Sequence, residues 1–170
     1  MNLRAAGALV LALVLTGCGS SERMPPCPKI FLSSDISTLT RFRPGSGRDL
    51  TDIEFQAELL GYSGSCKYEK TKLTITLNVG LAVSRGPASG REARFNYFVA
   101  IPKLYPSPAA KVDFDVAYPF QSGQGRGEFK DEVQIDIPFT DRTTVPSNEI
   151  YIGLQLTAEE LEYNRKQRER

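Results

Sequence analysis

The side chains that could carry chemistry in this sequence are few, because it contains three cysteines and no histidine. Histidine is the commonest general base and the commonest metal ligand, so its absence argues against most hydrolytic and metal-dependent mechanisms. Cys18, Cys27 and Cys66 lack the paired Cys-x-x-Cys spacing of a zinc site. We therefore expect a protein that is not an enzyme, with no catalytic residue, no metal ligand and no cofactor.

Other reactive groups occur in contexts that favour ordinary structural roles. Ser63 and Ser65 have no histidine to activate their hydroxyls, and the glycines near Arg48 match neither a dinucleotide fingerprint nor a phosphate loop. Several carboxylates could bind calcium or form an acid and base pair, but exposed strand faces carry charges for solubility anyway. These carboxylates are Asp113, Asp115, Asp131, Glu132 and Asp136.

The first residues have the layout of an export signal. Arg4 supplies one positive charge, and an apolar stretch of Ala, Leu and Val runs from Ala5 to Leu15. As a helix rising 1.5 Å per residue, about 11 residues span about 17 Å, too short for a hydrocarbon core of about 30 Å. The pattern predicts a signal peptide rather than a spanning helix.

The next residues, Leu15-Thr-Gly-Cys18, resemble the bacterial lipobox. The resemblance implies that residues 1–17 are removed as a lipoprotein signal peptide and that Cys18 is lipidated, since two or more acyl chains anchor a protein stably. An ordinary signal peptide with a chance cysteine is the alternative. Gly19 stands where retained inner-membrane lipoproteins often have Asp, so the resemblance favours the outer membrane, with the chain facing the periplasm.

Once Cys18 is assigned to lipid, Cys27 and Cys66 form an even pair in an oxidising compartment, and we expect a disulfide between them. Residues 18–26 have linker composition and form a lipidated tether of about 16 Å, so the domain should sit close to its membrane. Loss of Arg4 leaves 20 of the 21 basic side chains against 20 acidic ones. This balance predicts no nucleic-acid partner.

The elements that must position these residues are strands, because period-two alternation dominates from residue 50 onward. Turn sequences rich in glycine and proline separate the apolar ladders. About seven strands predict an all-β, immunoglobulin-like antiparallel sandwich over residues 27–157, with a small barrel as the alternative. The predicted strands cover residues 29–33, 53–59, 73–83, 95–101, 112–118, 133–139 and 150–156.

The last residues predict a short C-terminal helix and tail over 158–170. Thr157-Ala-Glu-Glu160 has the form of a capping box, and basic residues follow toward the end, which suits a helix dipole. Apolar positions, Leu161 among them, are few. We therefore expect this helix to pack lightly against the domain and to fray at its end.

Antiparallel strands would place alternate connections at opposite ends of the sandwich. Cys27, Cys66 and the tether then share one end, which should face the membrane. The other end gathers arginines among glycines, and arginine suits bidentate contact with carboxylates or phosphates, so this end is our candidate surface for an anionic partner. The alternative is that nearby acids neutralise it: Asp49, Asp52, Glu92 and Glu128. The arginines are Arg41, Arg43, Arg48, Arg85, Arg91 and Arg126.

Several segments resemble a family of alphaproteobacterial cell-envelope lipoproteins. The resemblance implies an envelope location and a lipidated Cys18, and it implies no reaction or substrate. The similar segments are residues 27–29, 39–52, 64–66, 85–87, 97–102 and 153–165.

Two functions fit these expectations. The first is a membrane-anchored, non-catalytic module that docks or scaffolds an envelope protein or a cell-wall partner. The second is a periplasmic carrier that holds a small apolar ligand between its sheets. A carrier needs an apolar cavity of about 300 Å³ or more, whereas a docking module should have a filled core.

Overall fold

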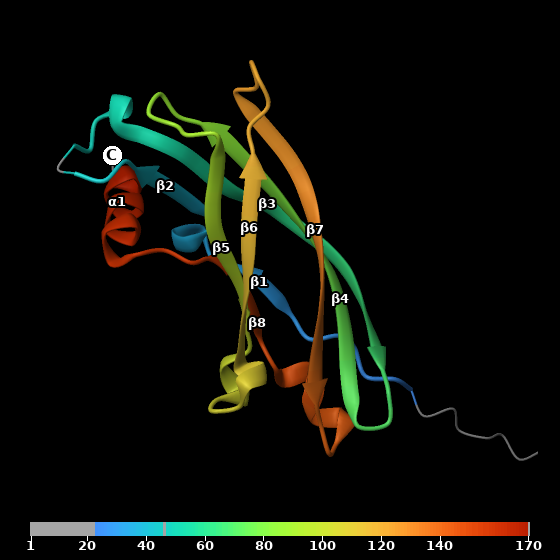
Figure 1. The fold of residues 1–170 in the computed structure, drawn as a ribbon. Coiled ribbons are helices and arrows are strands. Elements are labelled where there is room, and N and C mark those ends of the chain that lie inside the picture. Colours follow the sequence, from blue (N-terminus) through green and yellow to red (C-terminus); the bar gives the residue numbers. More distant parts are fainter. Residues whose placement is uncertain (1–22, 46, 170) are drawn as a thin grey trace, which may run out of the picture.

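The computed structural model describes residues 23–45 and 47–169 of the chain (Figure 1). The predicted signal peptide, the lipidation site at Cys18 and the first part of the tether lie outside the described residues. Eight strands and one α-helix form the fold of the described part. They are β1 (Ile30–Leu32), β2 (Thr38–Phe42), β3 (Ile53–Tyr68), β4 (Lys72–Arg85), β5 (Glu92–Ala100), β6 (Lys111–Pro119), β7 (Arg126–Pro138), β8 (Ile150–Leu154) and α1 (Ala158–Arg168).

The strands form two four-stranded sheets with the orders β1-β8-β5-β6 and β2-β3-β4-β7. All neighbours are antiparallel except β1 and β8, which run parallel. Short 3-10 helices occupy several connections: η1 (Ser34–Ile36), η2 (Leu50–Asp52), η3 (Pro102–Leu104), η4 (Pro108–Ala110) and η5 (Arg142–Ser147). The predicted all-β sandwich with a short C-terminal helix is confirmed.

The strand missing from the prediction is β2. Leu39 is buried, but the next side chain on its face is Arg41, whose guanidinium lies over the Phe55 ring at 5.8 Å. A charged side chain at that position breaks the apolar alternation on which the prediction depended. β1 and β2 run in the same direction on opposite sheets, and η1 lies where the chain crosses between them.

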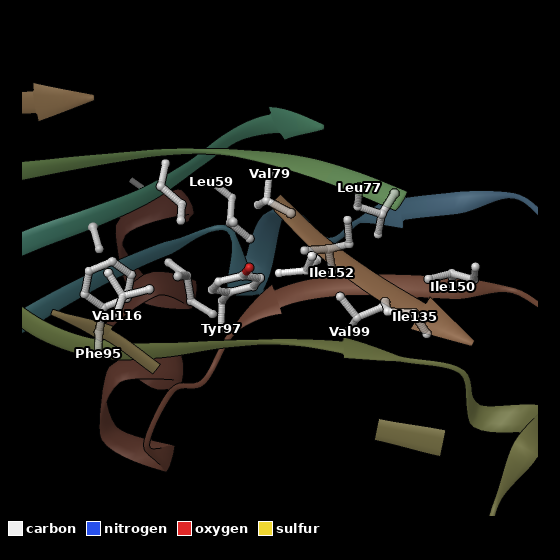
Figure 2. Packing of buried hydrophobic residues seen from close by; sticks show 14 of the residues in the cluster. Leu59, Leu77, Val79, Phe95, Tyr97, Val99, Val116, Ile135, Ile150 and Ile152 are labelled. Atoms are coloured by element: carbon white, nitrogen blue, oxygen red, sulfur yellow. The ribbon is translucent and has the colours of Figure 1, made fainter. Parts of the chain in front are cut away.

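The core lies between the two sheets. The labelled side chains of β3 and β4 point toward those of β5 and β8 in Figure 2. The predicted ladders from Leu73 to Val83 and from Phe95 to Ile101 are buried along their whole length on alternate residues. On β6 only Val116 is buried, because β6 is an edge strand paired with β5 alone. Tyr97 is fully buried, and burial together with its hydrogen bond to Asp131 (2.9 Å) raises the pKa of its phenol.

A β-bulge divides β3 into two halves. Leu59 pairs with Leu81, whereas Gly61 pairs with Gly80, so Leu60 is an extra residue without a partner on β4. Leu60 faces outward and is 45% exposed. Because side chains alternate with period two, one inserted residue reverses which positions face the core. Odd-numbered residues face inward before the bulge, and even-numbered residues face inward after it.

The bulge turns Cys66 toward the inside of the sandwich. Cys66 pairs with Ile75, whose side chain is buried, and directly paired residues share a face of a sheet. The predicted disulfide is present: Cys27 and Cys66 are bonded, with their Cα atoms 6.0 Å apart and 39 residues apart in sequence. Tyr68, two residues on, donates a hydrogen bond to the carbonyl of Pro26 (3.0 Å).

Deletion of Leu60 should therefore prevent the disulfide. Without the extra residue Cys66 turns to the outer face, so Cys27 and Cys66 should both be alkylated in the unreduced, unfolded protein. Loss of this crosslink should lower the free energy of unfolding by roughly 4 kcal/mol on the chain-entropy model. Peptide mass mapping and urea denaturation measure the two effects.

Leu60→Ala is the matched control, because it keeps the residue count of β3 and removes only an outward side chain. It should retain the bond between Cys27 and Cys66. A deletion variant that still forms this bond would contradict the role assigned to the bulge.

Candidate functional site

The six arginines singled out in the sequence lie at one end of the sandwich, which we call the distal end. It comprises the connections 43–52, 86–91 and 120–125, together with α1. The backbone links these connections, since Arg85 N donates to Gly125 O (2.7 Å) and Phe120 N donates to Arg91 O (3.0 Å). The β3–β4 turn lies at the opposite end (Figure 1), which we call the tether end, and the Cys27–Cys66 bond lies close to it because Cys66 is near the end of β3.

Four of these arginines pair with carboxylates of the same chain. Arg41 contacts Glu160 at 2.7 Å, Arg43 contacts Asp52 at 2.5 Å, and Arg48 contacts Glu159 at 3.0 Å. Arg126 lies 3.1 Å from Glu58 and 3.3 Å from Glu128, and these contacts raise its pKa. Most of the positive charge expected at the distal end is therefore balanced within the molecule.

Arg85 and Arg91 have no carboxylate partner in the described part of the chain. Arg85 donates to Ser89 Oγ (2.7 Å) and Gly90 O (3.2 Å), and it lies over the Phe120 ring at 5.3 Å. Arg91 is exposed. Of the four acids considered as neutralising partners, Asp52 and Glu128 do contact arginines of the set, whereas Glu92 pairs with Arg94 and Asp49 takes part in the capping turn of η2.

Asp52 organises the glycine-rich connection 43–52. Its side chain is buried, only 4% of the residue being exposed, and it accepts a hydrogen bond from Asp49 N (3.3 Å) as well as the ion pair from Arg43. A Cβ at Gly47 would lie 2.1 Å from the Asp52 carboxylate, so this position requires glycine. The described residues of this connection thus gather around one buried carboxylate, which is a structural role and not a phosphate-binding one.

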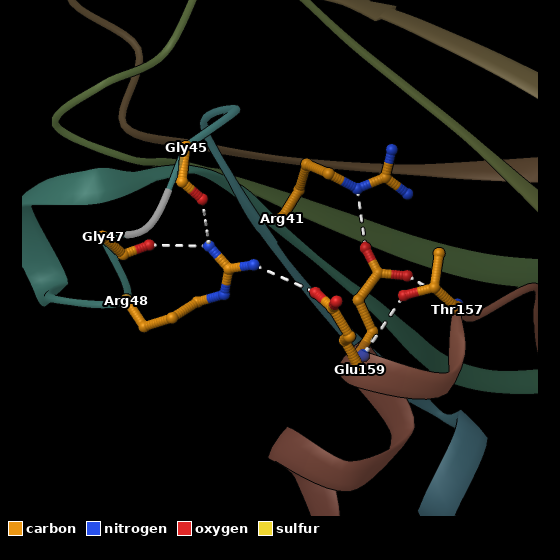
Figure 3. Close-up of polar contacts among 7 residues, drawn as sticks. Arg41, Gly45, Gly47, Arg48, Thr157 and Glu159 are labelled. Carbon is orange, nitrogen blue, oxygen red and sulfur yellow. Dashed lines mark hydrogen bonds and ion pairs between the residues drawn. The ribbon is translucent and has the colours of Figure 1, made fainter.

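The helix α1 docks through polar side chains rather than through Leu161. Its two buried residues are Glu160 and Asn164. Glu160 accepts from Thr157 N (2.8 Å) with one oxygen and from Arg41 Nε (2.7 Å) with the other, and part of this arrangement is drawn in Figure 3. Asn164 donates to the carbonyls of Asp35 (3.1 Å) and Thr38 (2.8 Å). The helix, which was expected to pack lightly, is thus held by specific polar contacts beside the ring contact between Phe42 and Tyr163.

The end of α1 is also fixed to η1. Arg168 lies 2.5 Å from the Asp35 carboxylate and donates to Ser34 Oγ (2.8 Å), and Arg165 lies 3.6 Å from the same carboxylate. The hydrogen bond from Arg168 is the main cause that holds the pKa of Asp35 below its usual range. None of these contacts had a signal in the sequence, because they join residues more than a hundred positions apart without any periodic pattern.

A cleft of about 630 Å³ lies at the distal end between β2, the connection 43–52 and α1. Phe42 and Tyr163 form its aromatic part, with ring centroids 5.2 Å apart in an edge-to-face arrangement. Charged side chains of both signs surround these rings: Arg41, Arg48, Glu159, Glu160, Glu162 and Lys166. The cleft thus combines two aromatic rings with charged side chains, and aromatic residues and arginine are enriched in protein interaction sites.

The carboxylates weighed as calcium or acid-base candidates are mostly engaged elsewhere. Asp131 accepts from Tyr97, and Asp136 accepts from Lys72 (2.6 Å) and Thr74 (2.7 Å), contacts that lower the pKa of Asp136. Asp113 contacts Lys111, and Asp115 contacts Asn96. Within residues 23–45 and 47–169, no cluster of three or more His, Cys, Asp or Glu side chains could hold a metal ion.

Comparison with protein-family models, with curated protein sequences and with solved structures gave no match. None of the helices in the described part of the chain is long and apolar enough to cross a bilayer. The described part of the chain is therefore an all-β sandwich whose C-terminal helix is held largely by polar contacts, with a cleft between that helix and β2.

The substitution Asn164→Ala should lower the free energy of unfolding by about 1–3 kcal/mol, because two backbone carbonyls lose their donor in a largely buried place. Urea denaturation of the purified protein measures this. Gln167→Ala is the control, since Gln167 is exposed on the same helix and should change stability by less than about 0.5 kcal/mol. Equal effects of the two substitutions would contradict polar docking of α1.

Acid should weaken the contact between α1 and η1. The folded state holds Asp35 at a pKa below its value in the unfolded chain, so its contribution is present above the ordinary aspartate pKa of about 3.9 and is lost as pH falls through the folded value. Asp35→Asn should therefore flatten the fall of the urea midpoint in acid. Glu132→Gln, an exposed control on β7, should leave the profile steep. Superimposable profiles for native protein and Asp35→Asn would refute this contribution.

Proposed function

We propose that this protein is a non-catalytic lipoprotein of the cell envelope, anchored through Cys18 and presenting its distal end to a partner as a docking or scaffolding module. The observation that carries the proposal is that the two ends of the sandwich differ in structure. The Cys27–Cys66 bond fixes the chain next to the tether at one end, and the cleft between β2 and α1 lies at the other.

The cleft is supported as a docking surface by the contacts that join its walls. Its walls are fixed by the Arg41–Glu160 and Arg48–Glu159 ion pairs and by the capping box at Thr157. Arg48 also donates to the carbonyls of Gly45 (3.1 Å) and Gly47 (2.8 Å) and lies over the Phe42 ring at 5.5 Å. A partner that binds a preformed surface loses less conformational entropy on association than one that must order it.

The competing function, transport of an apolar ligand between the sheets, has less support. Inward side chains of the two sheets contact one another directly, as Phe55 and Phe95 do with ring centroids 6.1 Å apart. The clefts of about 630, 520 and 400 Å³ are lined mostly by polar or exposed residues, and Val145 is the one side chain of the buried hydrophobic core among their described lining residues. A filled core favours docking over carriage.

Crosslinking in intact cells tests this proposal. The double substitution Arg48→Glu and Lys166→Glu reverses two positive charges on the rim of the cleft, and it should reduce the yield of a crosslinked partner by about tenfold, as losing about 1.4 kcal/mol of binding would. Quantitative mass spectrometry of the crosslinked products measures the yield. Cys18→Ser should remove the protein from the membrane fraction.

Arg94→Glu is the matched control, because Arg94 is an exposed arginine on the outer face of β5, away from the cleft. It should leave partner yield and membrane association unchanged. Equal yields for the native protein and the double variant would overturn docking at this cleft, and a Cys18→Ser protein that stays in the membrane fraction would overturn the anchor.

A further inference from the structure

The tether end carries lysines that lack carboxylate partners. We define this end by the start of the described chain, the β3–β4 turn and the connections 101–110 and 139–149. Lys29, Lys67 and Lys70 are exposed, and none of them makes an ion pair with the described residues. This contrasts with the distal end, where most arginines are paired.

The acids of the tether end are used within the domain. Asp136 pairs with Lys72, and Glu69 lies 4.0 Å from the same ammonium. Asp141 accepts from the backbone and hydroxyl of Thr143, and Glu149 accepts from the Tyr151 hydroxyl (2.7 Å). Asp141 and Glu149 keep their negative charges, because these partners are neutral. Lys103 is also exposed and donates to the neutral Ser147 hydroxyl, so the four exposed lysines outnumber these two acids.

The same end exposes aromatic and apolar side chains. Tyr105 is 82% exposed, and Met24, near the start of the described chain, is 57% exposed. Next to Tyr105, a cleft of about 520 Å³ is lined by Leu104, Phe139 and Val145 among polar residues. A tyrosine whose ring and hydroxyl both project outward suits the boundary between hydrocarbon and water, where tyrosine is enriched in membrane proteins.

These groups form one continuous surface. Phe139 N donates to Thr71 O (2.9 Å), which joins the β3–β4 turn and Lys70 to the connection after β7. Phe139 lines the cleft with Lys103 and Leu104, which lead directly to Tyr105. Figure 1 shows the connections around η3, η4 and η5 at the same end as the β3–β4 turn.

We infer that the tether end is a contact surface for an anionic phospholipid membrane, with Lys67, Lys70 and Lys103 facing the headgroups and Tyr105 entering the interface. This inference rests on the proposed lipid anchor. Cys27 lies nine positions after Cys18, so a lipidated Cys18 would hold the disulfide within about 32 Å of the membrane even with the chain fully extended. Basic residues near an anionic surface are attracted over about a Debye length, roughly 8 Å at physiological ionic strength.

The sequence contains no tryptophan, so a single introduced tryptophan reports on the surroundings of its own position alone. The full-length protein, processed and lipidated in cells, would carry Tyr105→Trp as its one tryptophan and be reconstituted into phosphatidylcholine vesicles with or without phosphatidylglycerol. Nitroxide-labelled lipid should quench the indole fluorescence of this variant at least about twofold more strongly in the anionic vesicles, because the lysines draw this end onto the surface. Adding Lys67→Glu and Lys70→Glu should abolish that difference.

Leu50→Trp is the matched control, because Leu50 is 74% exposed at the distal end. Its quenching should stay low in both kinds of vesicle. Flotation separates the possible failures: a protein that does not float with vesicles overturns the lipid anchor itself. A Tyr105→Trp protein that floats but is quenched no more than the Leu50→Trp protein overturns membrane contact and leaves the anchor standing. Strong quenching of Tyr105→Trp that is equal in both vesicles overturns the role of the lysines.

Discussion

The register of β3 is the constraint on which the two ends of this molecule depend. One unpaired residue, Leu60, reverses the faces of the second half of the strand, so Cys66 and Tyr68 point toward the first strand of the domain instead of toward solvent. Tyr62, the first side chain after the bulge, donates to the carbonyl of Ile30 in β1 (2.9 Å). The N-terminal part of the domain is therefore held to the long strand at several points, and it leaves the sandwich in a fixed place.

The alternation of apolar and polar residues predicted the strands that are paired on both sides and covered by the other sheet. It failed where a bulge or an ion pair interrupts the apolar face. β4 and β5 have neighbours on both sides and a sheet opposite, so every second residue is apolar. The second half of β3 contains glycines and follows a bulge. The glycines weaken the alternation of apolar and polar residues there, and the bulge shifts that alternation by one residue relative to the first half. β2 places Arg41 on its inward face, where the side chain pairs with Glu160 of α1, 119 residues away in the sequence. Such pairings depend on tertiary structure and cannot be derived from local pattern.

The placement of the arginines at one end could be predicted, and their charge balance could be predicted in part. Asp52 and Glu128 lie near their arginines in the sequence, whereas Glu58, Glu159 and Glu160 do not. The end of the sandwich at which a connection lies depends only on how many times the chain has run from one end to the other before it. Because β1 and β2 together make one passage, the missed strand did not change which end each later connection reaches. Two of the five neutralising acids, Glu159 and Glu160, lie on a helix whose docking has no hydrophobic pattern in the sequence. The exposed lysines at the other end could not be singled out from the sequence. Whether a lysine has a carboxylate partner is known only once the structure shows the partners of every neighbouring charge.

The position of the disulfide also has a mechanical consequence. A load between a lipid anchor and a partner at the far end would enter at Cys27 and pass through the covalent bond into β3, bypassing β1, whose parallel pairing with β8 spans only three residues. From there the load runs along β3 against β4, two long strands paired over most of their length. Strands pulled along their axis resist by shearing many hydrogen bonds at once, so a load applied in this way would meet one of the two longest strand pairings of the domain.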